Sequence, residues 1–219
     1  QFYDIGEHEN LRLFKSGDRI RVKHLEIEPI HVEHSVPGAY GFIIHTSKGA
    51  LVYTGDFRMH GPRSDMTREF ISKAAKAKPI AMLCEGTRME RECDHNYTEK
   101  EVEEKADALI RSTKGLVFAE FSMSNVDRFL SFYSATVKNK RKLVIDTKFA
   151  DILTSLREKV PALPDPLADP NILVYFRIDG DRTFSPMDYD KWEREFFPKK
   201  VTFREISKNG KGYVMHMGF

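Results

Sequence analysis

Apolar positions two residues apart dominate residues 19–54, and this spacing is typical of β-strands. Three such pairs follow one another with breaks between them: Ile20 and Val22, Leu25 and Ile27, and Ile30 and Val32. Two further apolar runs, at 41–46 and 50–54, flank the turn Ser47-Lys48-Gly49 and predict a hairpin. We therefore expect residues 1–60 to be rich in β-structure.

Further along the chain, helical segments alternate with short apolar runs. The pattern predicts helices at 68–78, 98–111, 125–138 and 149–159, and strands at 80–84, 116–119, 143–145 and 172–176. Pro79 ends the first helix, Thr98 and Glu101 form a capping box, and Ser124 can cap the third helix. Alternating strands and helices predict a parallel α/β sheet. We therefore divide the chain into residues 1–78 and residues 79–219.

Composition narrows the class of protein. The chain has 219 residues, of which 41% are hydrophobic, so it can bury a core. Its net charge of +2 is too small to imply nucleic-acid binding by its field alone. We expect no membrane span and a cytoplasmic location, because no long apolar run or signal peptide is apparent and Cys84 and Cys93 offer no disulfide framework. The chain begins with Gln1 and stops after an apolar run, so we expect a piece of something longer.

Polar residues gather where the predicted parallel strands end, and ligands bind beyond that edge in open sheets. Glu85 follows the first of these strands, Glu120 ends the second, and Asp146 follows the third. Ser122, Ser124 and Asn125 stand where a helix begins, a position that favours an anion such as a phosphate. The same residue types are also the preferred helix caps, so both interpretations stay open.

The stretch HVEHSVPGAYGF, residues 31–42, places His34 after a strand and before a turn. Asp56 follows a glycine at the end of the predicted hairpin. Imidazole and carboxylate at two strand ends suit a catalytic zinc ion, which keeps a position for water. A structural histidine and an aspartate that shapes a turn are the alternatives.

Four segments, in this order, resemble motifs of the metallo-β-lactamase superfamily and more specifically of the β-CASP nucleases such as ribonuclease J. They are HSVPGAYGFIIHT, GALVYTGDFRMHGP, LCEGTR and FSMSNVDRFLSFYSATVKNKRKLVID, and they span roughly residues 19–150. The resemblance implies an α/β fold: part of a metallo-β-lactamase αββα fold, then an incomplete β-CASP parallel α/β domain.

The resemblance also implies roles for individual residues. His34 would be a metal ligand, Asp56 a carboxylate that bridges two metals, and Glu85 the acidic residue that orients a ligand or the active-site water. Ser122, Ser124 and Asn125 would contact RNA phosphates. The cofactors would be two divalent metal ions, zinc first, with manganese or magnesium as alternatives. The substrate would be single-stranded RNA, cut in exonuclease or endonuclease mode, and a homodimer of the parent protein stays open.

Two departures from the family pattern leave the activity of the chain undecided. The motif His-x-His-x-Asp-His has no counterpart in residues 1–30, and the later β-CASP histidine motifs are also missing; we interpret His216 as a packing residue. One hypothesis is a ribonuclease of which this chain is a fragment, inactive alone. The other is a non-catalytic subunit that binds RNA or a partner. A lactamase-fold hydrolase of small esters is disfavoured because it needs no β-CASP insertion.

The basic run from Lys138 to Lys142 also has two interpretations. It could contact an RNA backbone, or it could be a solvated helix end where cations complement the helix dipole.

Overall fold

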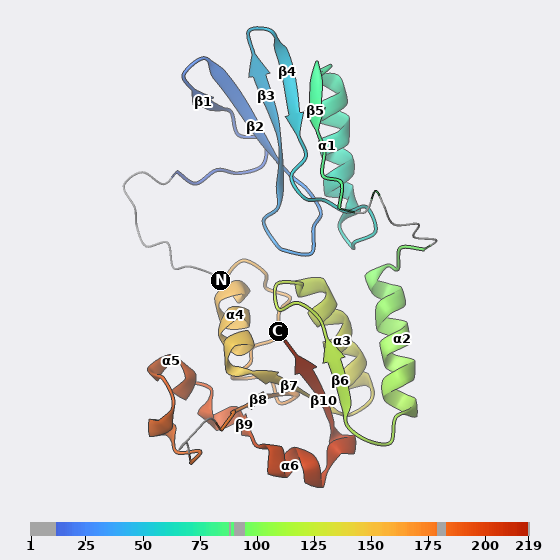
Figure 1. Cartoon of the computed structure of the whole chain (residues 1–219), viewed down its shortest axis with the longest axis vertical. Helices are drawn as coiled ribbons and strands as arrows, with labels where there is room; N and C mark the ends of the chain where they lie inside the picture. Colours follow the sequence, from blue (N-terminus) through green and yellow to red (C-terminus); the bar gives the residue numbers. More distant parts are fainter. Residues whose placement is uncertain (1–11, 88, 90–94, 179–182, 219) are drawn as a thin grey trace. The chain divides into compact units, whose positions relative to one another are not determined.

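The computed structural model of the chain describes residues 12–87, 89, 95–178 and 183–218. The chain forms two compact units, residues 1–99 and 100–219, and each contains a five-stranded sheet (Figure 1). No helix within the described ranges is long and apolar enough to cross a membrane. Arg88 of the LCEGTR segment and Cys93 lie outside the described residues.

The sheet of the first unit has the strand order β1-β2-β3-β4-β5. Its strands are β1 (Ile20–Val22), β2 (Leu25–His31), β3 (Tyr40–Thr46), β4 (Gly49–Tyr53) and β5 (Ala81–Leu83). The first four pair antiparallel, and β5 pairs parallel to β4. The β-rich character of residues 12–60 and the hairpin are therefore confirmed, while residues 1–11 lie outside the described residues. The apolar pairs predicted from Leu25 onwards fall largely in one strand, Leu25–His31.

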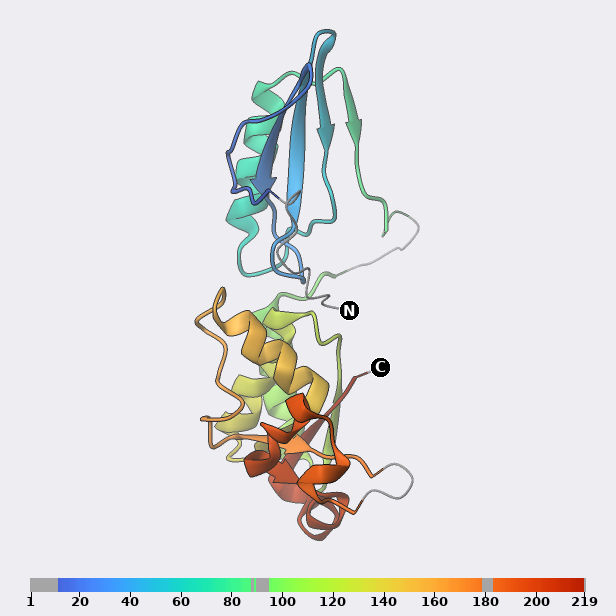
Figure 2. The same cartoon turned by 90° about the vertical axis from the view of Figure 1, so that its left-hand side faces the viewer.

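Helix α1 (Ser64–Lys76) covers one face of this sheet (Figure 2). Phe70 of α1 packs in a buried cluster with Ile30, Ile43 and Val52, which are 0–3% exposed. Gly41 of β3 admits the ring of Phe70, because a Cβ at Gly41 would lie 2.6 Å from that ring. The helix begins four residues before the predicted start at Arg68.

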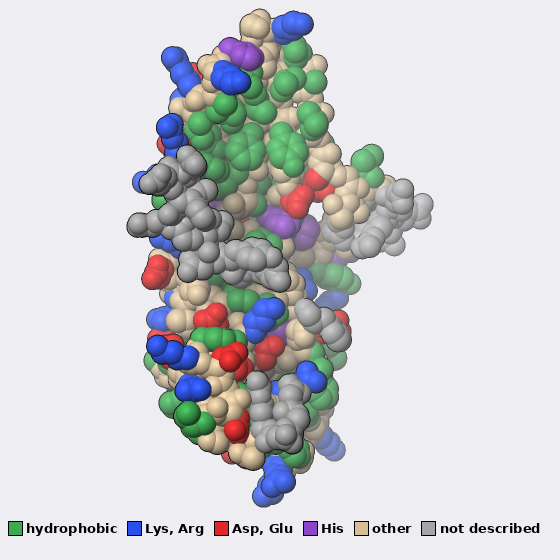
Figure 3. Space-filling view, turned by 60° about the vertical axis from the view of Figure 1, so that its left-hand side comes forward, with side chains coloured by type: hydrophobic (Ala, Val, Ile, Leu, Met, Phe, Trp, Pro, Cys, Tyr) green, Lys and Arg blue, Asp and Glu red, His purple; other side chains and the backbone are tan. Residues whose placement is uncertain are grey.

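The opposite face of the first sheet is also apolar, but no described helix covers it. Tyr53 and Leu83, which are register partners, are 49% and 59% exposed. Figure 3 shows hydrophobic side chains gathered on this unit. A sheet with a helix on one side and an apolar face on the other has the form expected of one half of an αββα fold.

The prediction that residues 80–84 form the first strand of the parallel α/β sheet is wrong. Strand β5 belongs to the first sheet, and all three of its residues are exposed. The amide of Ile80 donates to the carbonyl of Ala50 at 2.8 Å, which starts the pairing with β4. A short apolar run predicts a strand without specifying its neighbour. The assignment of residues 1–78 and 79–219 to two family domains stays a prediction.

The second unit is a parallel α/β sheet with the strand order β6-β10-β7-β8-β9. The strands are β6 (Val117–Glu120), β7 (Lys142–Asp146), β8 (Ile172–Tyr175), β9 (Lys200–Val201) and β10 (Tyr213–Met217). The helices are α2 (Glu99–Ser112), α3 (Val126–Lys138), α4 (Thr147–Arg157), α5 (Lys191–Arg194) and α6 (Phe203–Lys208), with short 3₁₀ turns at Pro186–Asp188, Phe197–Lys199 and Gly210–Gly212. The α/β class is confirmed, while the insertion of β10 between β6 and β7 was not predicted.

Both faces of the second sheet are buried at its centre. Leu143, Val144 and Ile145 are each 0% exposed. Leu143 and Ile145 share a core with residues of α2, α3 and α4, whereas Val144 packs with Ile206 of α6 on the other side. Burial on both faces explains the uninterrupted apolar run of β7, because parallel strands covered by helices need no polar face.

Candidate functional site

Three candidate residues follow strands that end at the same edge of the first sheet. His34 follows β2, Asp56 follows β4, and Glu85 follows β5. The pairing makes β2, β4 and β5 run in one direction, so their carboxyl ends share an edge. The structure therefore places the three segments at one edge of the sheet, and the prediction that His34 and Asp56 share a metal stays a prediction.

Gly55 shapes the backbone just before Asp56. Its φ of +57° is left-handed, and a Cβ there would lie 2.5 Å from the carbonyl oxygen of Tyr40. Only glycine meets both conditions without strain. The TGDF turn therefore requires glycine at position 55, directly before Asp56.

Thr54 connects the turn that carries Asp56 to the segment that carries Glu85. The amide of Glu85 donates to Thr54 Oγ1 at 3.1 Å, and the amide of Thr54 donates to the Leu83 carbonyl at 3.0 Å. The carboxylate of Glu85 accepts the Thr87 amide on Oε2 at 2.9 Å. Glu85 is therefore held at its backbone and at one carboxylate oxygen.

The side chains of His34 and Asp56 have fewer hydrogen bonds than that of Glu85 and its backbone. His34 Nδ1 accepts a 3.3 Å hydrogen bond from the Val36 amide. Asp56 is exposed, and no donor contacts its carboxylate among the described residues. An accepting Nδ1 places the proton of a neutral imidazole on Nε2. A metal on Nε2 would require that proton to move to Nδ1 and the Val36 contact to open.

His34 and Asp56 are the two metal ligands that the resemblance implies, and further ligands are not apparent among the described residues. No group of three or more His, Cys, Asp or Glu that could hold a metal occurs in the described part of the chain. A catalytic zinc site takes about three protein ligands, and a two-metal site takes more. His34 and Asp56 can therefore supply only part of a ligand set, and their role as ligands stays a prediction.

Glu33 and Arg58 fix the two loops that carry His34 and Asp56. Arg58 Nε donates to Glu33 Oε1 at 2.6 Å, and the backbone amide of Arg58 donates to the Glu33 carbonyl at 2.8 Å. The two side chains are only 10% and 4% exposed. Arg58 Nη1 also lies 3.6 Å from Oε1 of Glu99, the last residue of the first unit. This buried ion pair sits one residue from His34 and two from Asp56.

Further contacts surround the Glu33 carboxylate. Its Oε2 accepts the Arg63 amide at 3.0 Å, and a Cβ on Gly61 would lie only 1.9 Å from Oε1. Thr67 of α1 accepts the Glu33 amide at 2.9 Å and donates to the Arg58 carbonyl at 3.2 Å. Sequence reasoning missed this network. The sequence offered two signals for it: a carboxylate, Glu33, directly after an apolar strand, and an arginine, Arg58, directly after TGDF.

Ser122, Ser124 and Asn125 belong to the second unit, between β6 and α3. Asn125 caps α3, because its side chain accepts the Arg128 amide at 3.1 Å. The prediction that Ser124 caps this helix is therefore wrong. The hydroxyls of Ser122 and Ser124 lie 2.8 Å apart. Contact of these three residues with RNA phosphates stays a prediction.

Glu85 does not share an edge with Glu120 and Asp146, because β5 lies in the other sheet. In the second unit, Asp146 caps α4 by accepting the Phe149 amide at 2.7 Å. His216 of β10 is 4% exposed, and its Nε2 lies 2.8 Å from the carbonyl of Phe121. Burial lowers the pKa of His216 below its ordinary value, and the Phe121 carbonyl and Asp146 act against that shift.

Sequence comparison finds ribonuclease J proteins. The chain is 27% identical over 165 residues to "Ribonuclease J" of Mycoplasma pneumoniae, covering 71% of this chain and 28% of the relative. It is 29% identical over 140 residues to that of Sinorhizobium meliloti, covering 62% and 24%. It is 30% identical over 155 residues to "Ribonuclease J 2" of Streptococcus pyogenes, covering 68% and 28%. The chain thus spans under a third of the length of these relatives.

Structure comparison supports the fold alone. A solved protein of unknown function from Enterococcus faecalis V583 matches with a TM-score of 0.66 at 20% identity, covering 97% of this chain and 46% of that protein. No family model matches the chain. The ribonuclease J relatives support the assignment of this chain to the ribonuclease J family of β-CASP metallo-β-lactamase proteins, which its four motifs resemble.

Proposed function

We propose that this chain is part of a metal-dependent ribonuclease that hydrolyses RNA phosphodiester bonds. The observation that supports this most is the shared edge of the first sheet, where the segments of His34, Asp56 and Glu85 converge. The ribonuclease J relatives support RNA as the substrate.

The chain would contribute some of the residues of the site. His34 and Asp56 would be ligands for two divalent ions, with zinc as the first choice and manganese or magnesium as alternatives. Two such ions activate a water molecule and stabilise charge on the phosphate oxygens. Glu85, held by Thr54 and Thr87, would orient a ligand or accept a proton from water. The remaining ligands would come from the rest of a longer protein, because the relatives are much longer than this chain.

The experiment has two arms. In the first, the chain alone is incubated with zinc or manganese and a 5′-monophosphorylated RNA. We expect little cleavage and little rise in the melting temperature, because stabilisation by a ligand scales with ln(1 + [L]/Kd) and two ligands bind a metal weakly. Metal-dependent cleavage that Asp56→Ala abolishes would show that the chain holds a complete site.

In the second arm, the same RNA is offered to the longer protein that contains this chain. We expect cleavage that Asp56→Asn reduces strongly, while Asp18→Asn, an exposed substitution of the same kind, leaves it unchanged. The alternative function is a non-catalytic subunit that binds RNA or a partner. RNA binding without cleavage by the longer protein, at any of the three metals, would establish that alternative.

A further inference from the structure

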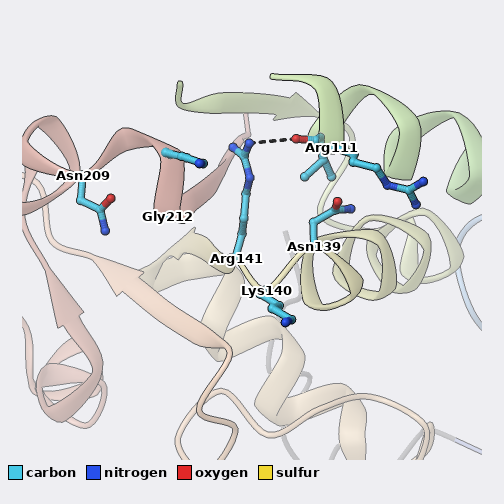
Figure 4. Close-up of a pocket in the computed structure, with 8 residues that line it drawn as sticks. Arg111, Asn139, Lys140, Arg141, Asn209 and Gly212 are labelled. Carbon is cyan, nitrogen blue, oxygen red and sulfur yellow. Dashed lines mark hydrogen bonds between the residues drawn. The ribbon is translucent and has the colours of Figure 1, made fainter. Parts of the chain in front are cut away.

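A pocket of about 460 Å³ lies at the amino-terminal edge of the second sheet, away from the strand ends that carry Ser122, Ser124 and Asn125. It is formed by the last turn of α2, the end of α3 and the 3₁₀ turn before β10 (Figure 4). The lining residues are Ile110, Arg111, Asn139, Lys140, Arg141, Asn209, Lys211 and Gly212. Four of them are cations, none is a carboxylate, and only Ile110 is apolar.

Arg141 determines the charge at the floor of this pocket. It is 6% exposed and donates to the carbonyls of Ile110 and Gly115, each at 2.8 Å, and to that of Thr113. These carbonyls end α2 and lead into β6, so they would otherwise present partial negative charge. Without Arg141, these carbonyls would repel an anion. The guanidinium of Arg141 covers them and gives this edge a positive charge.

The other cationic side chains of the pocket differ in whether a carboxylate neutralises their charge. Arg111 is paired with Asp107, so this pair adds no net charge. Lys140 and Lys211 are exposed, and no carboxylate pairs with either of them among the described residues. Lys114 and Lys142 stand on the same edge, just before β6 and at the start of β7. The net charge around the pocket is therefore positive.

The two lysines reach the pocket from different parts of the chain. Lys140 has a left-handed φ of +56° just after α3, which directs the chain sharply into β7. Lys211 lies in the turn Gly210–Gly212, where a Cβ on Gly212 would lie 2.7 Å from the side-chain nitrogen of Asn209. Because β10 lies between β6 and β7, these segments are neighbours although they are far apart in the chain.

We propose that this pocket binds a phosphate group of an RNA strand, outside the catalytic edge of the first sheet. The volume falls in the range of ligand sites and suits a nucleotide, and four cationic side chains with no carboxylate among the lining residues favour an anionic ligand. Lysine ammonium groups bind phosphate as point charges. The choice of RNA over another polyanion rests on the proposed ribonuclease function.

The test measures binding of a fluorescein-labelled single-stranded RNA by anisotropy over a series of salt concentrations. The double variant Lys140→Asn, Lys211→Gln removes both charges, and asparagine tolerates the left-handed backbone at position 140. We expect roughly tenfold weaker binding, as for the loss of two exposed ion pairs, and a shallower salt slope by about 0.7 per lost phosphate contact. The control is Lys159→Gln, Lys191→Gln, which makes the same charge change at exposed positions elsewhere in this unit.

Inorganic phosphate serves as a second probe, followed by NMR. We expect amide shifts at Gly212 and Lys140 that the double variant abolishes. Equal RNA affinity in the double variant and in the control would overturn the proposal, and so would tighter binding of polyglutamate than of RNA. The Asp56→Asn variant separates this proposal from the proposed function, since it should strongly reduce cleavage by the longer protein and leave affinity at the pocket unchanged.

Discussion

Arg58 Nε donates to Glu33 Oε1 across 2.6 Å, and this contact joins the loop after β2 to the loop after β4. Both side chains are almost excluded from solvent. A buried ion pair adds little net stability over an apolar pair, but loss of one partner leaves the other charge buried and uncompensated. The positions of His34 and Asp56 therefore depend on a charge pair that itself does no chemistry.

Glu33→Gln should destabilise the first unit. Breaking a buried ion pair costs about 3–5 kcal/mol, and here the carboxylate also accepts the Arg63 amide. Glu26→Gln is the matched control, because Glu26 is 32% exposed and its pair with Arg19 should contribute about 0.2–1 kcal/mol. Urea unfolding of each variant measures the difference. Equal midpoints for the two variants would contradict a supporting role for the Glu33–Arg58 pair.

Gly61→Ala should also destabilise the first unit, because the new methyl group would meet the Glu33 carboxylate at 1.9 Å and Arg58 Nε at 2.5 Å. The loop or the ion pair must move to admit it, and such overpacking costs about 1–3 kcal/mol. Gly115→Ala provides the comparison, since a Cβ there meets nothing within 4 Å. Thermal unfolding should show a clear loss for the first variant and almost none for the second.

Acid should weaken the second unit partly through His216. Burial lowers its pKa in the folded protein, so the unfolded chain binds the proton more readily. The contribution is therefore complete above the unfolded pKa of about 6.5 and is lost as the pH falls from there towards the folded pKa. His216→Gln should flatten the change in urea midpoint between about pH 7.5 and 5.5.

A residual slope should remain in His216→Gln, because burial also lowers the pKa of His31 in the first unit, with Arg63 acting in the same direction and Glu33 against it. Glutamine can still donate to the Phe121 carbonyl, so the variant keeps the hydrogen bond while losing the titration. If wild type and variant show the same pH dependence, His216 does not contribute to it.

Alkali should act through Tyr133, whose hydroxyl donates to Asp169 Oδ2 at 2.5 Å. Burial, followed by this carboxylate, raises the pKa of Tyr133 to about 12. The associated stability is complete below the unfolded pKa of about 10 and is lost as the pH rises from 10 towards 12. Ultraviolet titration should show a late-ionising component that disappears in Tyr133→Phe, and an unchanged titration curve in this variant would refute the assignment.

Local pattern was enough to predict much of the fold. The β3–β4 hairpin and helices α3 and α4 follow from spacing, turn residues and caps within a few positions. The partner of β5 and the place of β10 could not be predicted in this way. Pairing between distant segments is decided by which faces can be buried together, and a three-residue run such as Ala81–Leu83 carries too little pattern to specify it.

The sequence was enough to predict those candidate site residues that directly follow a strand. His34, Asp56 and Glu85 all follow strands, and the structure places their segments at one edge. Glu33 escaped notice because a lone carboxylate between Val32 and His34 is more often expected to face water. Its burial depends on Arg58, which lies in another loop, and such a pair is visible only after the chain has folded.

The position of strand β10 affects how the second unit folds during synthesis. It lies between β6 and β7, yet it is the last of the three to leave the ribosome. Until residues 213–217 emerge, β6 and β7 have no direct pairing and each exposes an open hydrogen-bonding edge. Nascent chains that stall or are cut before this strand should therefore aggregate or attract chaperones, and refolding should be limited by its late, long-range insertion.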